Sequence, residues 1–497
     1  MPLLDLPKEL LDNIAVQALR PDSFESLLLS CKAIYASCKE HIPRYNALLK
    51  WRRMTLDGDT QPSNNGVSAV TEILLAIVED PEIADFIEVL DLRKAQMWKS
   101  QRTTPVDKID ALRKLVRSSP YLSIAGQDPH DWVKMLDLDV GHILDECSVV
   151  CHQTTLLLTL LPKLKDLTLP EHWGRVSDEE GCLAVLNAVV RNARDALSPE
   201  DMQKFEADSS DVALLSTLRE KPLSSLEQLR PYEEVEYDPA SRGGLVDVAP
   251  FMILPNIKHL HVSNLIGVSD GYTGIPFEWP YDTAESGLQG AFSNLESIHL
   301  EGCVVDHNGI TELVSHTPRL QSLRYSHHTK WHGCAHDWDA GAFVNALAKY
   351  AGQTLRSLSL NLDVLYGDTE SAISTLHNFE VLENFEADVW TFFCTSEDQE
   401  MNRTKSLAEL LPNSIRSVKL VFNEPNDNRD FEDLEVFKSL CGPRSAYGAY
   451  SDLQQLAICA VETSQLPLFE LQNLADGLEW SYKEVPREGV VGKMPRA

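Results

Sequence analysis

Three short stretches of the sequence carry side chains whose chemistry could support catalysis or metal binding. The first is Gly267-Val-Ser269-Asp-Gly271, which matches the Gly-x-Ser-x-Gly spacing of a hydrolase nucleophile. That motif needs a strand before the serine and a helix directly after it, so that the serine sits on a sharp turn. Here Pro276 and Pro280 follow within a few residues, and they prevent a helix. We therefore expect a loop at Ser269 and no catalytic serine.

The second stretch gathers metal-binding side chain types within ten residues, namely His327, His328, His332, Cys334 and His336. Imidazole and thiolate groups are good ligands for zinc and other transition metals. The stretch lacks a Cys-x-x-Cys pair and a second cluster at zinc-finger spacing. The pattern favours an aromatic surface loop over a zinc site, and it leaves metal binding by residues 327–336 open.

The third stretch, Cys147 and Cys151-His152, lies on a predicted helix, and packing in the core explains it. No Walker loop, dinucleotide fingerprint or His-Glu-x-x-His motif occurs in the chain. We therefore predict no catalytic residue, no cofactor and no bound metal, so the chain is not expected to be an enzyme.

Composition indicates an intracellular protein. The N-terminus carries Asp5, Lys8 and Glu9 where a signal peptide needs an uninterrupted apolar stretch. The densest apolar run, 156–161, is too short to span a bilayer. The ten cysteines follow no regular framework, which is typical of reduced thiols in the cytoplasm or nucleus.

The charge is distributed unevenly along the chain. Residues 1–60 hold eight basic and eight acidic side chains, so the whole formal charge of −31 belongs to the remainder. A body of that sign repels phosphate backbones and anionic lipid. Nucleic acid and membrane are therefore not expected as partners, and a basic protein partner is weakly favoured.

The N-terminal residues have the apolar spacing of a small helical module. Leu6, Leu10, Leu11 and Ile14 predict an amphipathic helix over 5–20 that begins at a Leu-Pro pair. Asp22-Ser-Phe-Glu25 has the capping-box spacing and predicts the start of a second helix. Further helices are expected at about 31–38, where Ile34 or Tyr35 is buried, and at about 44–53.

Residues 4–40 resemble an F-box, the helical motif that binds the Skp-type adaptor of cullin-based ubiquitin ligases. The positions that carry the resemblance are Leu6, Pro7, Glu9, Leu10, Ile14, Leu19, Leu27, Cys31 and Lys32. The family often has Trp three residues after the cysteine, whereas this chain has Ile34 there with Tyr35 beside it. An ordinary N-terminal helical packing unit is the alternative. The resemblance implies that the adaptor is bound by Leu6, Pro7, Leu10, Leu11, Ile14, Leu19, Leu27, Cys31, Lys32 and Tyr35.

A second pattern, apolar-x-x-apolar-x-apolar, recurs through the rest of the chain. The copies begin at Ile87, Leu164, Ile257, Leu295, Leu320, Leu355, Leu382, Ile415 and Leu453, and the copy at Leu382 is weak. From Ile257 onward the steps between copies run from 25 to 38 residues. Recurrence at such a period indicates a solenoid, in which each copy is a strand and the intervening residues return outside it. Helices are expected at about 309–316, 340–350 and 371–376.

The copies resemble irregular leucine-rich repeats, which accompany many F-boxes, as in F-box proteins of the fungal type. The Asn or Cys that caps the turn after each strand occurs here only as Cys303 and Asn423. An irregular α/β domain whose strands share a hydrophobic pattern is the alternative. The expected fold class is α/β, with a three-helix F-box followed by an irregular leucine-rich-repeat-like solenoid.

The expected organisation is an F-box module at 1–55, a linker at 56–66, the solenoid at 67–480 and a tail at 481–497. An acidic insertion is expected near 198–245. Residues 132–161 fit either a strand copy or a helix.

These resemblances imply the substrate-recognition adaptor of an SCF-type cullin E3 ubiquitin ligase, in the ubiquitin-like conjugation pathway. The F-box would bind the Skp-type adaptor, and the repeats would bind an unknown protein substrate. The alternative is a leucine-rich-repeat scaffold for protein–protein interaction that works without a ligase. Strand alternation places the partner-facing side chains at the x positions of the copies. These are Asp166, Thr168, His259, His261, Ser297, His299, Ser322, Arg324, Ser357, Ser359, Asn384, Glu386, Ser417 and Lys419.

Overall fold

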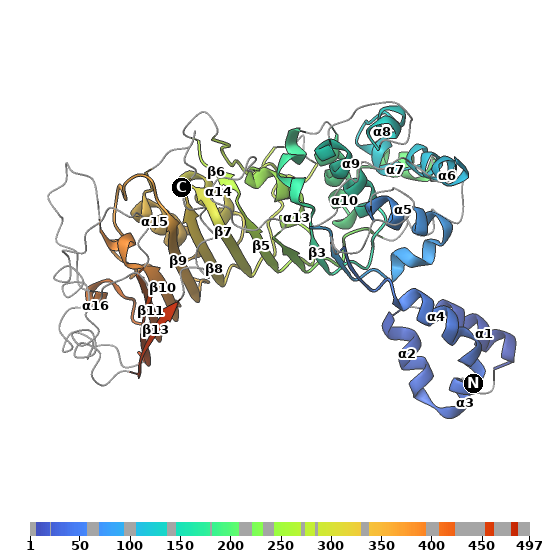
Figure 1. The fold of residues 1–497 in the computed structure, drawn as a ribbon, viewed down its shortest axis with the longest axis horizontal. Helices are drawn as coiled ribbons and strands as arrows, with labels where there is room; N and C mark the ends of the chain where they lie inside the picture. The colour runs from blue at the N-terminus through green and yellow to red at the C-terminus, as the bar shows by residue number, and fades with distance from the viewer. Residues whose placement is uncertain are drawn as a thin grey trace. The chain divides into compact units, whose positions relative to one another are not determined.

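A computed structural model describes most of the chain (Figure 1). The described residues are 6–19, 21–56, 69–93, 106–136, 146–178, 181–207, 221–231, 243–269, 274–283, 287–329, 337–393, 407–422, 453–461 and 479–485. The protein is of the α/β class with parallel strands. It divides into two compact units, one of residues 1–228 and 254–256, the other of residues 229–253 and 257–497.

The first unit begins with four short helices: α1 (Lys8–Gln17), α2 (Pro21–Ser30), α3 (Lys32–Cys38) and α4 (Ile42–Leu49). We define these as the N-terminal helices. The four predicted helices are confirmed, but the predicted cap at Asp22 is wrong, because α2 already begins at Pro21. Proline suits the first helical position, since its fixed φ is helical and it needs no N–H partner there. Of the two candidates for burial on α3, Ile34 is buried and Tyr35 is exposed.

The N-terminal helices have a small core that continues into the next segment. Phe24 packs on Tyr45 with ring centroids 4.9 Å apart, and Tyr45 packs edge-on against Phe86 at 5.8 Å. Arg44 on α4 donates to Asp80 at 2.6 Å and to Glu82 at 2.7 Å. Phe24 and Phe86 are fully buried. The N-terminal helices are therefore packed against residues 80–86.

The rest of the first unit surrounds three parallel strands, β1 (Arg53–Thr55), β2 (Val89–Asp91) and β3 (Asp166–Thr168), paired in that order. The 3-10 helices are η2 (Lys39–His41), η3 (Pro81–Asp85) and η4 (Glu171–Asp178). The further helices are α5 (Ala69–Glu79), α6 (Val106–Arg117), α7 (Pro120–Ile124), α8 (Pro129–Met135), α9 (Glu146–Leu158), α10 (Cys182–Ala193) and α11 (Pro199–Ala207). The ambiguous segment 132–161 contains the end of α8 and all of α9, and no strand lies in its described parts. The predicted fourth helix is shorter than expected, because Arg53 starts β1.

Glu88 joins the starts of all three strands of the first unit. Its carboxylate accepts hydrogen bonds from Arg52 at 2.6 Å and Lys165 at 2.9 Å, and its side chain is 11% exposed. Burial would raise the pKa of Glu88, but the hydrogen bonds and charges of Lys165 and Arg52 outweigh it and hold the pKa below its usual value.

We expect Glu88→Gln to lower the free energy of unfolding by about 1–3 kcal/mol at neutral pH, because it weakens two charge-assisted hydrogen bonds. A depressed pKa contributes stability above the unfolded pKa, and this is lost as pH falls through the folded pKa. Urea unfolding of wild type and variant should therefore converge towards pH 3. Glu227→Gln is the matched control, since Glu227 precedes the next strand but is exposed. Equal effects of both substitutions would contradict the prediction.

The second unit holds a parallel sheet with strands in the order β5-β7-β8-β9-β10-β11-β12-β13. These strands are β5 (His259–Ser263), β7 (Ser297–Val305), β8 (Ser322–His328), β9 (Ser357–Val364), β10 (Asn384–Asp388), β11 (Ser417–Phe422), β12 (Gln455–Val461) and β13 (Glu479–Val485). The two-residue strand β6 (Ile266–Gly267) pairs with β7 and is not part of this order. In β4 (Gln228–Arg230), Gln228 belongs to the first unit and the next two residues to the second.

All nine predicted strand copies are strands, including the weak copy that begins at Leu382, which forms β10. The sequence pattern missed β1, β4, β6 and β13. Strand β13 reaches Val485, so the predicted tail begins within a strand. The predicted acidic insertion contains α11 and β4 in its described parts. Most of the predicted linker, 57–66, lies outside the described residues.

The strands share one feature at their starts. A single carbonyl oxygen accepts hydrogen bonds from two consecutive N–H groups of the next strand segment. In the second unit these acceptors are Lys258, Glu296, Gln321, Arg356, Glu383 and Arg416, and in the first unit they include Arg52 and Glu88. Within each unit, this repeated hydrogen bonding aligns the starts of the strands that it joins.

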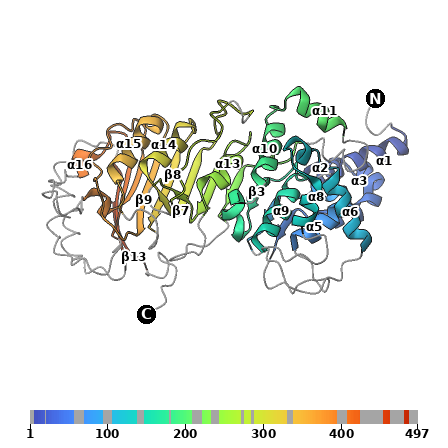
Figure 2. The ribbon, with the colours of Figure 1, turned by 90° about the horizontal axis from the view of Figure 1, so that it is seen from above.

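Helices α14 (His307–Ser315) and α15 (Ala340–Ala351) lie next to each other on one side of β7, β8 and β9 (Figures 1 and 2). Their Asp caps, Asp306 and Asp339, accept N–H hydrogen bonds at 2.7 Å. The other short elements are η5 (Leu245–Val248), α13 (Ala249–Met252), η7 (Val389–Phe392) and α16 (Leu407–Leu410). The prediction of a helix at 371–376 is wrong. The N–H groups of Ile373 and Leu376 donate to the carbonyls of Thr391 and Leu410 instead of to carbonyls within a helix.

Candidate functional site

Large apolar side chains are exposed mainly on the N-terminal helices. Leu10 is 47% exposed, Val16 46%, Leu29 85% and Tyr35 51%. In the rest of the described chain, the exposed large apolar residues are Met202, Phe292 and Tyr350. The four residues lie on α1, α2 and α3, and α3 contacts both other helices. We call Leu10, Val16, Leu29 and Tyr35 the apolar surface. Concentrations of exposed apolar side chains are candidates for interaction sites, so these residues make the N-terminal helices a first candidate site.

The residues predicted to bind an adaptor fall into three groups. Pro7, Leu10, Lys32 and Tyr35 are exposed, whereas Leu6, Ile14, Leu27 and Cys31 are half-buried. Leu11 and Leu19 are buried, so they can act only by packing the helices. Sequence reasoning missed Val16 and Leu29. The Leu27-Leu28-Leu29 run was a signal for the latter, because three consecutive leucines cannot all face the inside of one helix.

A second candidate site is the side of the second unit's sheet that carries polar residues. Register pairing places His261, His299, Arg324, Ser359, Glu386 and Lys419 in one row across six strands. A neighbouring row contains His259, Ser297, Ser322, Ser357, Asn384 and Ser417. We call these two rows the polar strand face. The strands' apolar residues, such as Leu260 and Ile298, are buried.

Most of the polar strand face is accessible, with His259, Arg324 and Asn384 exposed. Two of the predicted partner-facing residues are buried instead. Ser359 is 5% exposed and accepts a hydrogen bond from Asn361 at 3.3 Å. In the first unit, Thr168 is 3% exposed, whereas Asp166 is half-buried. Small side chains between larger neighbours on a pleated sheet lose their exposure, so Ser359 and Thr168 cannot contribute much contact area.

Charged groups on this face are arranged in pairs. Lys419 Nζ lies 3.1 Å from Glu386 Oε2, and Asn361 donates to Glu386 Oε1 at 3.3 Å. His261 Nε2 lies 2.9 Å from Glu301 Oε2. Glu301 lies two residues beyond His299 on β7 and therefore on the same side of the sheet. Sequence reasoning missed Glu301, because it follows the last position of the repeat pattern.

Histidines 261 and 299 are stacked, with ring centroids 4.0 Å apart and planes at 19°. Burial, followed by the charge of His261, lowers the pKa of His299 to about 4, so its imidazole is neutral at physiological pH. The hydrogen bond from His261 holds the pKa of Glu301 below its usual value, against the opposing effect of burial. The arrangement therefore presents uncharged imidazole beside an ionised carboxylate.

The pKa of Asp363, near the end of β9, is shifted upwards, whereas the pKa values of His299 and Glu301 are shifted downwards. Burial raises its pKa from 3.8 to about 6, although a hydrogen bond with Ser326 lowers it. A raised carboxyl pKa means that the folded state loses stability as pH rises from about 4 to 6 and stays penalised above that range.

We expect Asp363→Asn to raise the free energy of unfolding by about 1–3 kcal/mol at pH 7.5 and to leave it unchanged near pH 4. Asparagine retains a partner for Ser326 without the cost of burying a charge. Urea unfolding at the two pH values measures the difference. A variant that is no more stable than wild type at pH 7.5 would contradict the expectation.

The other sequence motifs form no catalytic site in the described residues. Ser269 follows β6, and its hydroxyl lies 3.4 Å from the Asp306 carboxylate that caps α14. No helix is present at 274–280, as predicted. His327 and His328 are 2% exposed within β8, so the prediction of a surface loop is wrong for these two residues. His332, Cys334 and His336 lie outside the described residues.

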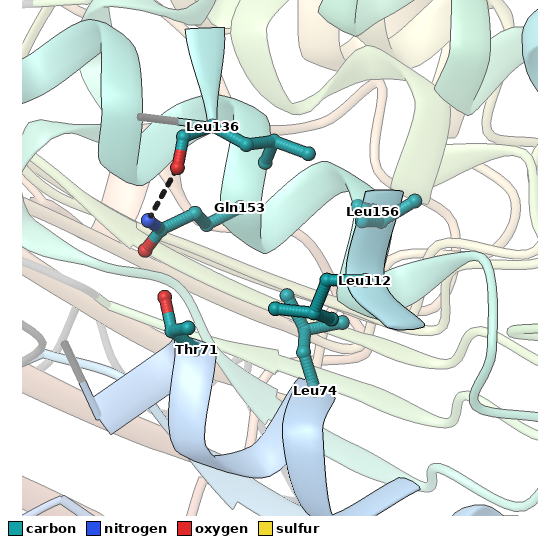
Figure 3. A pocket seen from close by; sticks show the side chains of 6 residues that line it. All are labelled: Thr71, Leu74, Leu112, Leu136, Gln153 and Leu156. Atoms are coloured by element: carbon teal, nitrogen blue, oxygen red, sulfur yellow. Dashed lines mark hydrogen bonds between the residues drawn. The ribbon is translucent and has the colours of Figure 1, made fainter. Parts of the chain in front are cut away.

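A small cavity lies between α5, α6 and α9 in the first unit (Figure 3). Its lining consists of Thr71, Leu74, Leu112, Leu136, Gln153 and Leu156, and Gln153 donates to the Leu136 carbonyl at 3.5 Å. The space inside is about 10 Å³, which admits one water molecule at most. This is a packing gap and not a substrate site.

Searches with protein-family models and against curated proteins match nothing to this chain. Among the described helices, none combines the length and apolar character needed to cross a bilayer. The fold, the apolar surface and the polar strand face therefore carry the functional conclusion.

Proposed function

We propose that the chain is the substrate-recognition adaptor of an SCF-type cullin E3 ubiquitin ligase. The N-terminal helices act as the F-box and bind a Skp-type adaptor, which joins them to a cullin. The polar strand face holds a protein substrate for ubiquitin transfer by the recruited E2 enzyme. The chain itself supplies position and no catalytic group, and it acts in the cytoplasm or nucleus.

One observation carries this proposal: four of the exposed large apolar residues lie on the helices whose sequence resembles an F-box. An adaptor that packs on α1–α3 would bury Leu10, Leu29 and Tyr35. Interfaces of this kind owe most of their affinity to a few aromatic and aliphatic anchors. The remainder of the chain instead presents polar and charged groups on its strands, which suits a separate partner.

The departure from the F-box pattern at Ile34 is consistent with this proposal. Ile34 is buried at 5% exposure, whereas Tyr35 is half-exposed on the outside of α3. Tyrosine offers an aromatic ring and a hydroxyl to a partner at low entropic cost. Tyr35 would therefore take the place of the family's tryptophan in contact with the adaptor.

The resemblance to leucine-rich repeats draws support from the repeated carbonyl acceptors at the strand starts. Cys303 adds to it, because its Sγ accepts the Leu265 N–H at 3.4 Å. That is the turn-capping role that the family gives to a Cys or Asn at this position. Asn423, the other such residue, lies outside the described residues.

Affinity purification of the tagged full-length chain from eukaryotic cell extract tests the proposal. We expect a Skp-type adaptor and a cullin in the wild-type complex, and their loss with Leu6→Ala combined with Pro7→Ala. Recovery that is unchanged in this variant would reject the F-box. A wild-type complex with protein partners but without adaptor and cullin would favour the ligase-independent repeat scaffold.

A further inference from the structure

Two histidines and a glutamate on the second unit's sheet lie close enough to share one metal ion. His261 is on β5, and His299 and Glu301 are on β7. One potential ligand atom from each lies within 4.8 Å of the other two, which is true of no other group of three in the described part of the chain. We propose that His261, His299 and Glu301 bind a single Zn²⁺ ion.

The backbone places these ligands in a way that favours a shared ion. His261 and His299 are direct partners in the parallel register of β5 and β7. Neighbouring strands are about 4.8 Å apart, so the two imidazoles leave the sheet side by side. Glu301 projects from the same face as His299, two residues further along. The three side chains therefore form a triangle over one side of two strands.

Zinc binding would require the stacked rings of His261 and His299, whose planes now meet at 19°, to rotate until both planes contain the ion. Zinc–nitrogen and zinc–oxygen bonds of about 2.0–2.2 Å place neighbouring tetrahedral ligands about 3.4 Å apart. His261 Nε2 and Glu301 Oε2 are 2.9 Å apart, somewhat closer than this. The His261–Glu301 hydrogen bond would be replaced by two metal bonds. The same ligand types, two histidines and one carboxylate, hold zinc in open sites that keep one position for water.

Two charged residues near the three ligands would change the affinity of the site for a cation. Arg324 pairs in register with His299, and its positive charge opposes a cation. Its side chain is exposed, so it can turn into solvent when the ion binds. Asp363 is close enough to interact electrostatically with the Glu301 carboxylate, and its negative charge favours a cation. All three ligands are half-buried, which leaves the fourth zinc position open to water.

The backbone around Glu301 is held by several hydrogen bonds. The Glu301 carbonyl accepts the Asn264 N–H at 2.9 Å, and the next residue, Gly302, donates to Ser326 Oγ at 2.7 Å. Gly302 has a φ of 58°, which glycine adopts without strain. The register of β7 with β8 shifts between Leu300 and Cys303, so Glu301 and Gly302 lie at the irregularity. A ligand on a backbone fixed in this way loses little freedom when it binds an ion.

Calorimetric titration of the tag-free, chelator-treated full-length chain with Zn²⁺ tests the site. We expect one ion per chain with micromolar or tighter affinity. His299→Ala and Glu301→Gln should each weaken binding at least tenfold, as the loss of one of three ligands requires. X-ray absorption should show two imidazole nitrogens and one carboxylate oxygen in wild type.

Two control variants separate this site from other histidines. His259→Ala changes an exposed histidine on the same strand, and His316→Ala changes a histidine whose Nε2 lies 3.1 Å from Asp282. Both should bind Zn²⁺ as wild type does. Circular dichroism spectra identical to wild type show that the ligand variants are folded.

No binding by folded wild type, or equal binding by His299→Ala and wild type, would overturn the site. Neither result bears on the adaptor proposal, because the N-terminal helices contribute no ligand. Loss of adaptor binding in an F-box variant would likewise leave Zn²⁺ binding unchanged.

Discussion

Replacing Leu10 and Tyr35 by alanine in the full-length chain is expected to weaken binding of a purified Skp-type adaptor at least a hundredfold. Both side chains are about half exposed in the free chain, and both lie on helices that resemble an F-box. Truncating a central interface anchor costs about 2 kcal/mol or more, and two such losses correspond to a hundredfold or greater change in Kd. Calorimetric titration of wild type and variant with the adaptor measures the change.

Two exposed aromatic residues of the second unit provide matched controls. Phe292 is 51% exposed and Tyr350 is 39% exposed, so their substitution by alanine removes similar apolar area far from the N-terminal sequence. We expect the Phe292→Ala, Tyr350→Ala double variant to bind the adaptor as wild type does. The helices tolerate alanine, which has the highest helix propensity, so the Leu10 and Tyr35 variant should retain its unfolding midpoint.

Three results would contradict this expectation, and each has a different meaning. Wild-type binding that persists in the Leu10→Ala, Tyr35→Ala variant would show that the adaptor contacts another surface. No measurable binding by folded wild type would reject the F-box itself. Weakening of the same size in the control variant would show that general surface hydrophobicity, and not these helices, holds the adaptor.

Replacing Tyr325 by alanine is expected to lower the free energy of unfolding by about 3–5 kcal/mol, which is the range for truncating buried aromatic residues to alanine. Tyr325 is 1% exposed and stacks on Phe343 with ring centroids 4.7 Å apart. Its hydroxyl accepts the Val305 N–H at 3.1 Å and lies 2.7 Å from His327 Nδ1. The ring thus packs α15 onto the sheet, while the hydroxyl satisfies backbone groups at the irregular end of β7.

Tyr325→Phe separates these two contributions. The ring remains, so we expect a smaller loss of about 1–3 kcal/mol, the cost of leaving buried polar groups without their partner. Denaturant unfolding measures both variants, with Tyr350→Ala as an exposed control expected to stay within about 0.5 kcal/mol of wild type. Equal losses for Tyr325→Phe and Tyr325→Ala would contradict the role assigned to the ring.

The strand predictions succeeded because they rest on alternation along the chain. Leu260 and Val262 alternate with His259 and His261, and burial of the two apolar residues follows directly from that order. Even the weak copy at Leu382 forms β10, since Phe385 and Ala387 still alternate with polar residues. The pairing of His261 with His299 was also predictable, because equivalent positions of neighbouring copies meet in register.

The predictions that failed depended on contacts between residues distant in the sequence or on residues outside the repeat pattern. The expected helix at 371–376 is absent because its N–H groups bond to carbonyls of Thr391 and Leu410, which no local pattern reveals. His327 and His328 were predicted to lie in an aromatic surface loop, but they are buried residues of β8. Glu301 was missed because β7 runs nine residues, beyond the pattern that identified it.

The sequence by itself therefore determined the α/β class, the positions of nine strands and the helical character of the N-terminus. Each depends on interactions between residues close in the chain or on a repeated spacing. Only the tertiary structure decided which apolar residues of the N-terminal helices stay exposed, because that depends on how α1–α4 pack against one another and against Phe86. It also decided that Glu301 joins His261 and His299, because two strands from different parts of the chain must pair before their side chains can meet.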